Sequence, residues 1–277
     1  MMLPRNRCWL HAIFAGVVLL SSIGEVRADR LADIRARGVL RVGVSGDYRP
    51  FSFCAENTTD CEGFDIVVAH RMATDLGVQL ALTRFRWPEL LDDLRANTFD
   101  IAMSGITIRP ERLLHATFTQ PYTIAAAVVL VTDAKRFTSL TAVDRPNIRL
   151  AVNAGGHLER VARAHFRHAT ILPTAKNLSL PDLVAYQQAD ALLTDSLEAP
   201  HFLAAHRSLR ALPAFGRDRK AYMVRRTDSE LREWLEHWLL ARETDGFLNA
   251  LRTRWVKSEQ GVKSIHCRRC LLCWMFA

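Results

Sequence analysis

Two carboxylates lie three positions apart at residues 194–199 (Thr-Asp-Ser-Leu-Glu-Ala), where an apolar segment ends. A carboxyl group beside a second carboxylate has a raised pKa, which suits a general acid, so Glu198 next to Asp195 could donate a proton. Both residues also have a plainer interpretation. Asp195 could cap the helix expected after it, and a helix dipole favours an acidic residue such as Glu198 in the first turn. The sequence leaves both interpretations open.

A candidate anion site lies earlier in the chain, at Arg112 in the segment 109–112 (Arg-Pro-Glu-Arg). A guanidinium group binds a carboxylate through two parallel hydrogen bonds, and Ser104 and Thr107 could add donors nearby. The alternative is a solvated charge at a helix end. The pattern indicates a site for a small carboxylate-bearing ligand.

Apolar residues recur with strand and helix periods in two successive sets of elements. In the first set, strands are expected at 39–44, 78–85 and 99–103, and helices at 30–37, 63–76, 88–96 and 109–115, the last capped by Thr107. In the second set, strands are expected at 125–132, 149–152, 170–172 and 191–193, and helices at 158–164 and 180–188. An apolar segment at 220–224 and helices at 229–243 and 246–255 follow.

This order of elements predicts an α/β protein with parallel sheets covered by helices. No proline- or glycine-rich linker divides the chain, so we expect two lobes joined by crossing strands, with a cleft between them. Lobe 1 is expected to hold residues 29–124 and 219–256, and lobe 2 residues 125–218.

The first 28 residues have the organisation of a secretory signal peptide. Arg5 and Arg7 precede an apolar stretch at 9–23, and 26–28 (Val-Arg-Ala) offers a cleavage site. The stretch is short for a membrane span, which takes about 20 residues, although an uncleaved anchor is the alternative. We predict an exported, periplasmic protein without a membrane span after cleavage. Its net charge of +8 comes from scattered basic residues, which favours small anions rather than nucleic acid as partners.

The six cysteines fall into three groups: Cys8; Cys54 and Cys61; and Cys267, Cys270 and Cys273. The second pair flanks a polar loop, and export favours a local disulfide over two free thiols. The third group follows His266 in the tail at 257–277, where no second pair completes a tetrahedral metal site. We predict an irregular tail and no metal or organic cofactor.

Several segments carry a family resemblance: 46–53 (Gly-Asp-Tyr-Arg-Pro-Phe-Ser-Phe), 99–107 (Phe-Asp-Ile-Ala-Met-Ser-Gly-Ile-Thr), Glu111-Arg112 and Pro121-Tyr122. They resemble the family 3 (polar-amino-acid type) solute-binding proteins, which have the type II periplasmic-binding-protein fold. The resemblance covers residues 29–256. The segments 153–156 (Asn-Ala-Gly-Gly) and 194–199 are most similar to the periplasmic cyclohexadienyl dehydratases of this family, which convert prephenate and arogenate.

The resemblance implies a role for each candidate site residue. Glu198 corresponds to the general acid of the dehydratases, and Arg112 to the arginine that grips the ligand carboxylate. Asp195 resembles the acid that takes the ammonium group in amino-acid binders. The other ligand-binding candidates are Asp47, Ser104, Thr107, Asn153, and the aromatic residues Phe51 and Trp87, which resemble walls around the ligand ring. Trp87 could instead be plain core.

The chain departs from the dehydratase pattern at two places. His157 and Leu158 stand where the family usually has Thr-Asn, and 123–129 is apolar where the family has a charged stretch with a lysine. Two functions are therefore expected as alternatives. One is the decarboxylating dehydration of prephenate or arogenate to phenylpyruvate or phenylalanine. The other is binding of an amino acid or small organic acid for an ABC permease, in which His157 could be a ligand contact or only the start of a helix.

Overall fold

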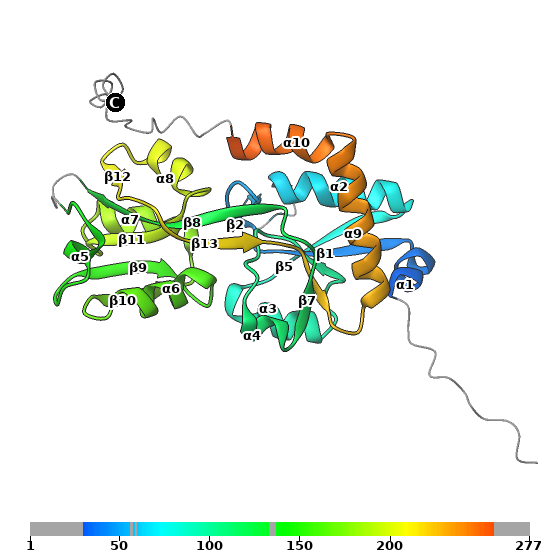
Figure 1. Cartoon of the computed structure of the whole chain (residues 1–277), viewed down its shortest axis with the longest axis horizontal. Helices are drawn as coiled ribbons and strands as arrows, with labels where there is room; N and C mark the ends of the chain where they lie inside the picture. Colours follow the sequence, from blue (N-terminus) through cyan, green and yellow to red (C-terminus); the bar gives the residue numbers. More distant parts are fainter. Residues whose placement is uncertain (1–29, 56–57, 59, 133–136, 258–277) are drawn as a thin grey trace, which may run out of the picture.

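The computed structural model describes residues 30–55, 58, 60–132 and 137–257. They form two α/β lobes, each built around its own sheet (Figure 1). We call the part with the sheet β5-β1-β6-β14-β7 lobe 1, and the part with the sheet β10-β9-β11-β8-β12 lobe 2. The predicted two-lobed α/β class is confirmed, while the lobe boundaries given above stay a prediction. The signal peptide predicted at 1–28 and the tail from residue 258 lie outside the described residues.

Lobe 1 contains most of the first half of the chain and its C-terminal helices. Its elements are α1 (Arg30–Arg37), β1 (Val39–Val44), β2 (Asp47–Tyr48), β3 (Ser52–Cys54), β4 (Cys61–Glu62), α2 (Phe64–Leu76), β5 (Gln79–Arg84), η1 (Trp87–Glu89), α3 (Leu90–Arg95), β6 (Ile101–Ala102), α4 (Pro110–Leu113), β7 (Ala116–Phe118), β14 (Met223–Arg225), α9 (Ser229–Thr244), α10 (Phe247–Arg252) and the π-helical turn η4 (Thr253–Lys257).

Lobe 2 is continuous in sequence. Its elements are β8 (Thr123–Thr132), α5 (Leu140–Val143), β9 (Arg149–Asn153), α6 (His157–His165), β10 (Thr170–Thr174), η3 (Asn177–Ser179), α7 (Leu180–Ala185), β11 (Ala191–Asp195), α8 (Ala199–Ala205), β12 (Leu209–Ala211) and β13 (Phe215–Lys220).

Parallel pairing in the two sheets follows from the strand–helix–strand order. In lobe 1, β1 is parallel to β5 and β6, and in lobe 2, β9 is parallel to β10 and β11. Buried apolar clusters lie against these strands, so both sheets are covered by helices, as parallel sheets require. Within the described part of the chain, no helix combines the length and the apolar character needed to cross a bilayer.

Two antiparallel strands carry the chain between the lobes. The chain enters lobe 2 through β8 and returns through β13, which lie side by side across the middle of the molecule (Figure 1). Lys220 at the end of β13 pairs with Thr123 at the start of β8, and it also forms an isolated bridge with Thr107 of lobe 1. The last residue of β13 therefore lies where both lobes meet.

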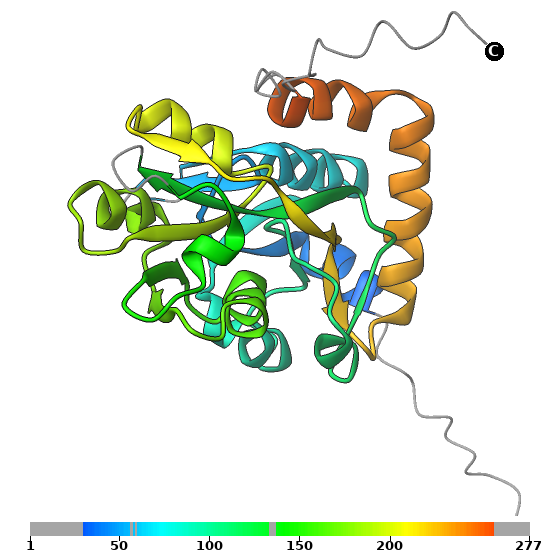
Figure 2. The same ribbon diagram turned by 60° about the vertical axis from the view of Figure 1, so that its left-hand side comes forward.

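The C-terminal helices belong to the core of lobe 1. Leu231, Leu235 and Trp238 of α9 and Leu248 of α10 are buried in the same cluster as Ile34 of α1. Figure 2 shows α9 standing along one edge of lobe 1, with α10 turned across its top. α9 thus covers the side of lobe 1 away from lobe 2, and α10 runs from it back over lobe 1 (Figure 1).

Candidate functional site

A cavity lies between the two lobes, and its atom-free space, counted together with the open solvent at its mouth, is about 400 Å³. Lobe 1 contributes Tyr48, Trp87, Gly105, Thr107 and Arg112 to its lining, lobe 2 contributes Asn153, Gly156, His157, Leu158, Asn177, Asp195 and Glu198, and Lys220 comes from β13. The cavity thus brings together six of the nine residues predicted for the site: Trp87, Thr107, Arg112, Asn153, Asp195 and Glu198.

Arg112 is the cation that lobe 1 presents to the cavity. It lies in α4, which Pro110 opens, and it is 2% exposed. One terminal nitrogen donates to the carbonyl oxygen of Thr107 at 2.9 Å, whereas its Nε has no hydrogen-bond partner. Burial, followed by the charge of Arg109, lowers the pKa of Arg112 to about 9. A desolvated guanidinium without an ion pair among the described residues is a strong site for an incoming carboxylate.

Glu198 lies at the turn between β11 and α8 and is 1% exposed. Its Oε1 accepts from Asn177 Nδ2 at 2.6 Å, and its Oε2 accepts from the Thr194 hydroxyl at 2.7 Å. Burial, and then the negative charge of Asp195, raise the pKa of Glu198 well above its usual range. The carboxyl group therefore keeps a proton to a higher pH than a free glutamate does, and the Thr194 hydroxyl, which can accept as readily as donate, suits that form.

Asp195 is the ionised acid of the cavity. Burial alone would raise its pKa, but the charge of Lys220 and the hydrogen bond from Tyr48 outweigh burial and lower it. Lys220 Nζ lies 3.2 Å from Asp195 Oδ2, and the Tyr48 hydroxyl donates to the same oxygen. The other oxygen, Oδ1, accepts from the main-chain N–H groups of Leu197 and Glu198.

A second acid, Asp218, continues this network behind Lys220. Lys220 Nζ lies 3.1 Å from Asp218 Oδ2 and donates to the Thr107 hydroxyl at 3.2 Å. The Thr107 hydroxyl in turn donates to Asp218 Oδ2 at 2.9 Å. His157 Nε2 lies 3.5 Å from the same oxygen, and burial lowers the pKa of His157 to about 4, so the ring is neutral at neutral pH.

The uncharged part of the wall consists mainly of aromatic and amide groups. The Trp87 ring meets the Tyr48 ring edge-on, with centroids 6.1 Å apart. Asn153 is 8% exposed, and its Oδ1 has no hydrogen-bond partner among the described residues.

Three predicted site residues do not line this cavity, and two of them, Phe51 and Ser104, are buried behind its wall. Phe51 is fully buried and packs on the rings of Tyr48 and Tyr122. The Ser104 hydroxyl is bonded to the hydroxyls of Ser45 and Ser52.

Asp47 faces a neighbouring cavity instead, which it shares with Trp87 and Asn153. Its carbonyl oxygen accepts from Asn177 Nδ2 at 2.9 Å, so Asn177 connects this strand of lobe 1 with Glu198.

Two expected helix caps differ from what the structure shows. Thr107 does not cap α4, whose N-cap position is Arg109, because its hydroxyl is bonded to Asp218 and Lys220. Asp195 does not cap α8 either, since its side chain closes the turn that precedes the helix.

The sequence interpretation missed Tyr48, Asn177 and Lys220. Tyr48 stood inside the segment 46–53, three residues before Phe51, but nothing in that pattern shows which of the two rings faces the cavity. Lys220 stood at the edge of the apolar segment 220–224, where a buried lysine needs acidic partners that only the fold supplies.

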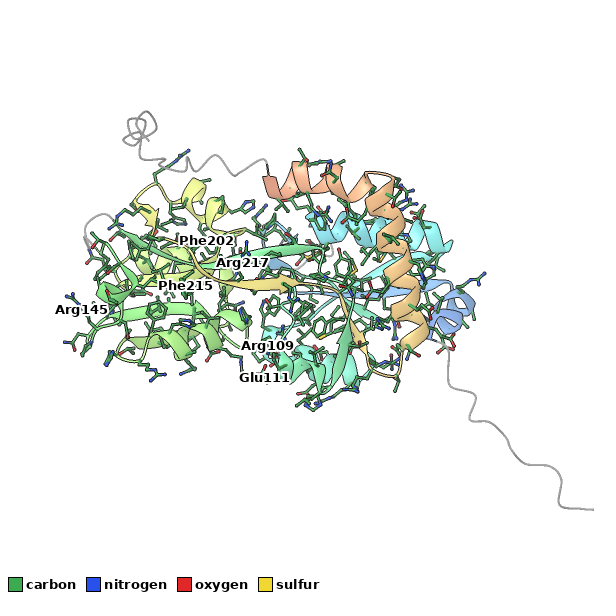
Figure 3. The ribbon with its side chains drawn as sticks, viewed as in Figure 1. Arg109, Glu111, Arg145, Phe202, Phe215 and Arg217 are labelled. Atoms are coloured by element: carbon green, nitrogen blue, oxygen red, sulfur yellow. A yellow bond between two sulfur atoms is a disulfide. The ribbon has the colours of Figure 1, made fainter. Side chains whose placement is uncertain are left out.

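Contacts at the rim hold the two lobes together. Arg109 donates to the carbonyl oxygen of Gly156 at 3.3 Å, and Glu111 is paired with Arg160 of α6. Figure 3 shows Arg109 and Glu111 at the junction of the lobes. The structure therefore describes a closed arrangement.

Two further predictions concern sites away from the cavity. The sulfur atoms of Cys54 and Cys61 are bonded at 2.01 Å, between β3 and β4. No group of three or more potential metal ligands occurs among the described residues. The tail cysteines lie outside that part of the chain.

Residues 40–258 match the family model of the bacterial extracellular solute-binding proteins, family 3. Cyclohexadienyl dehydratase of Pseudomonas aeruginosa is 34% identical over 92% of this chain and 97% of its own length. The L-cystine-binding protein TcyJ of Escherichia coli is 26% identical over 87% of this chain and 93% of its own. The crystal structure of the ancestral amino acid-binding protein AncCDT-1, a precursor of cyclohexadienyl dehydratase, superposes with a TM-score of 0.77 at 33% identity, covering 82% of this chain and 99% of the other. The chain belongs to this family.

Proposed function

We propose that this family 3 protein is a periplasmic cyclohexadienyl dehydratase, which removes water and carbon dioxide from prephenate or arogenate. The observation that carries the proposal is the buried Glu198 carboxyl group, which has a raised pKa and lines the same cavity as the unpaired Arg112. The similarity to the Pseudomonas aeruginosa dehydratase over nearly the whole chain supports the same activity.

Arg112 would bind the carboxylate of the ligand's side chain rather than the carboxylate on the ring. An ion pair to the ring carboxylate would stabilise the reactant, whereas its loss as carbon dioxide is easier in weakly polar surroundings. Trp87 and Leu158 offer such surroundings on the cavity wall. The ligand ring would therefore lie along this wall, with its side chain directed at Arg112.

Glu198 would then donate its proton to the ring hydroxyl as the carbon–oxygen bond breaks and water leaves. The electron pair of the bond between the ring and its carboxylate moves into the ring, carbon dioxide departs, and the ring becomes aromatic. The proton ends in the water molecule, so the Glu198 carboxylate must regain a proton from solvent before the next turnover. Asn177 and Thr194 hold both of its oxygens throughout.

The test is turnover of prephenate and arogenate by the purified protein and by Glu198→Gln. Glutamine keeps the hydrogen bonds but has no acidic proton, so kcat should fall by about 10²–10⁴-fold while ligand binding persists. Glu233→Gln on the exposed face of α9 is the matched control and should retain full activity. Turnover that survives in Glu198→Gln would remove Glu198 from the mechanism.

A second candidate function is a binding protein that delivers an amino acid or organic acid to an ABC permease. Both oxygens of Glu198 already have donors, which a purely structural acid would also need, and the Escherichia coli relative is a cystine-binding protein. Tight binding of a ligand without turnover of either cyclohexadienyl acid would favour this function.

A further inference from the structure

We infer that the C-terminal segment of this chain, residues 258–277, binds in an apolar groove on lobe 1, between α9 and the residues that lead into β8. The groove lies apart from the cavity between the lobes, because no residue that lines one lines the other. When bound, the segment would cover the exposed side chain of Leu240 and join α9 to the residues just before β8. The inference is independent of the proposed function.

The groove is a hollow between two parts of lobe 1 that are distant in sequence. Leu239 and Leu240 of α9 and Leu248 of α10 form one side, and Pro121 and Tyr122 form the other. Its atom-free space, counted together with the open solvent at its mouth, is about 710 Å³. Leu240 is 65% exposed, whereas Leu239 and Leu248 belong to the buried core. A single exposed leucine is ordinary, but one that extends an apolar groove indicates an interaction surface.

The end of the described chain lies within reach of the groove. Leu248 is in the first turn of α10, and the turn η4 that follows ends at Lys257. At 1.5 Å per helical residue, Lys257 is about 14 Å from Leu248 along the axis. Residues 258–270 span about 40 Å when extended, so residues 271–277 can return to the groove. A segment tethered at such a distance has an effective concentration near millimolar, so a modest affinity keeps it bound.

The composition of this segment matches the groove. Residues 271–276 (Leu-Leu-Cys-Trp-Met-Phe) contain five large apolar side chains around Cys273. Burial of such side chains is the dominant favourable term in most protein association. The groove offers the apolar surface for this burial.

The charges on either side are opposite in sign. Residues 229–245 contain five acidic side chains (Glu230, Glu233, Glu236, Glu243 and Asp245) and two basic ones (Arg232 and Arg242). Two of these acids line the groove: Glu236, and Glu243, which is also paired with Arg252. Residues 258–270 contain three basic side chains and one acidic one: Lys263, Arg268, Arg269 and Glu259. An acidic rim therefore faces the basic part of the segment when the apolar part is in the groove.

The experiment follows the thiol of Cys273 in the full chain. Cys54 and Cys61 are bonded to each other, so serine at the other three cysteines leaves Cys273 as the one free thiol: Cys8→Ser, Cys267→Ser and Cys270→Ser. Its reaction rate with the neutral reagent 4,4′-dithiodipyridine is compared with that of a free peptide of residues 263–277 that carries the same serines. A Kd of roughly 0.1 mM at a millimolar effective concentration keeps about nine-tenths of the segment bound, so we expect a reaction about 10-fold slower than in the peptide.

Leu240→Gln in the same background removes the exposed apolar contact and keeps the helix propensity of the position. The bound population should fall by about 10-fold relative to the unbound one, so the thiol should react within about 2-fold of the rate of the peptide. Leu114→Gln is the matched control, because Leu114 is 68% exposed and does not line the groove. This variant should keep the slow reaction.

Three results would overturn the inference. The first is a Cys273 thiol that reacts as fast in the protein as in the peptide. The second is protection that survives Leu240→Gln, which would place the segment elsewhere. The third is protection that grows with protein concentration, because the groove would then hold the segment of a second copy. None of these measurements involves a ligand of the cavity, so the inference and the proposed function can fail separately.

Discussion

Burial shifts the pKa values of Arg112 and Glu198 in opposite directions. Desolvation disfavours the charged form of each, so it lowers the pKa of the guanidinium group to about 9 and raises that of the carboxyl group. Arg112 nevertheless remains charged at neutral pH, whereas Glu198 keeps its proton to a higher pH than a free glutamate does. One closed cavity thereby holds a cation that needs an anion and a carboxyl group whose proton is held more firmly than usual.

Replacing Arg112 by methionine should separate binding from stability. The variant keeps the aliphatic stem but loses the guanidinium group, so affinity for a carboxylate ligand should fall by about 2–5 kcal/mol. The free energy of unfolding should hold or rise, because a buried charge without an ion pair is removed. Calorimetry and denaturant unfolding measure the two quantities, and Arg95→Ala at an exposed position of α3 serves as control. Unchanged affinity would show that the ligand carboxylate binds elsewhere.

The sequence predicts site residues when they lie within one short segment. Arg112 and Glu198 were identified because the residues around them form contiguous patterns. Lys220 could not be, because its partners Thr107 and Asp195 lie far away along the chain and become neighbours only when β13 pairs with β8. The choice between Tyr48 and Phe51 as cavity wall likewise depends on side-chain direction in a turn, which composition does not fix.

At the scale of elements, the long apolar strand β8 was predicted and the charged strand β13 was not. β8 is buried over most of its length, and its apolar run 125–132 indicated a strand. β13 contains Arg217, Asp218 and Arg219, a pattern typical of a loop, and it is held as a strand by pairing with β8. β13, the strand that the sequence did not predict, is the one that returns the chain to lobe 1.

The start of α2 is connected to both crossing strands through Asp65. This fully buried carboxyl group accepts from the hydroxyls of Tyr122 and Tyr222 and from the main-chain N–H group of Gly105. Tyr122 directly precedes β8, and Tyr222 lies two residues after β13. Asp65 therefore holds in place the ends of β8 and β13 that adjoin lobe 1.

Asp65 should make the protein less stable as the pH rises, which is the opposite of the usual effect of a carboxyl group in a folded protein. Burial raises its pKa from 3.8 to about 7, so the folded state holds a proton that the unfolded chain has released. Its contribution to stability is complete below about pH 4 and is lost as the pH rises through about 7, by up to about 4 kcal/mol.

The variant Asp65→Asn isolates this effect. It should gain stability relative to wild type over the same pH range, because an asparagine amide can replace the protonated acid in all three hydrogen bonds. Urea unfolding of both proteins from pH 4 to 8 measures the difference, which cancels the other titrating groups. A difference that stays constant across this range would mean that Asp65 is ionised in the folded protein throughout.

For the whole molecule, function depends on closure of the two lobes around the cavity. Residues of both lobes line the cavity. Asn177 Nδ2 of lobe 2 donates both to Glu198 and to the main-chain carbonyl oxygen of Asp47 in lobe 1. Opening would break this link and expose Glu198 to water, which lowers the penalty for its ionisation. Proton donation and ligand enclosure should therefore occur in the same closed form.

Gly155 provides a direct test of closure. Its φ is 71°, and an added Cβ would lie 2.7 Å from Pro88 of lobe 1, a collision that exists only when the lobes meet. Gly77 at the end of α2 has nearly the same φ, 69°, with nothing within 4 Å of an added Cβ. Alanine at either position should lower the free energy of unfolding by about 1–2 kcal/mol, because both positions have the left-handed backbone conformation that disfavours a Cβ atom.

Gly155→Ala alone should therefore weaken ligand affinity and turnover, because it opposes the closed form. We expect a loss of about 10-fold or more, with Gly77→Ala close to wild type in both, since a collision of this kind costs at least ~1.4 kcal/mol. X-ray scattering with saturating ligand should show a larger radius of gyration for Gly155→Ala than for Gly77→Ala. If both variants close and bind alike, the contact between Gly155 and Pro88 does not limit closure, and the ligand must be held without the two lobes meeting at this point.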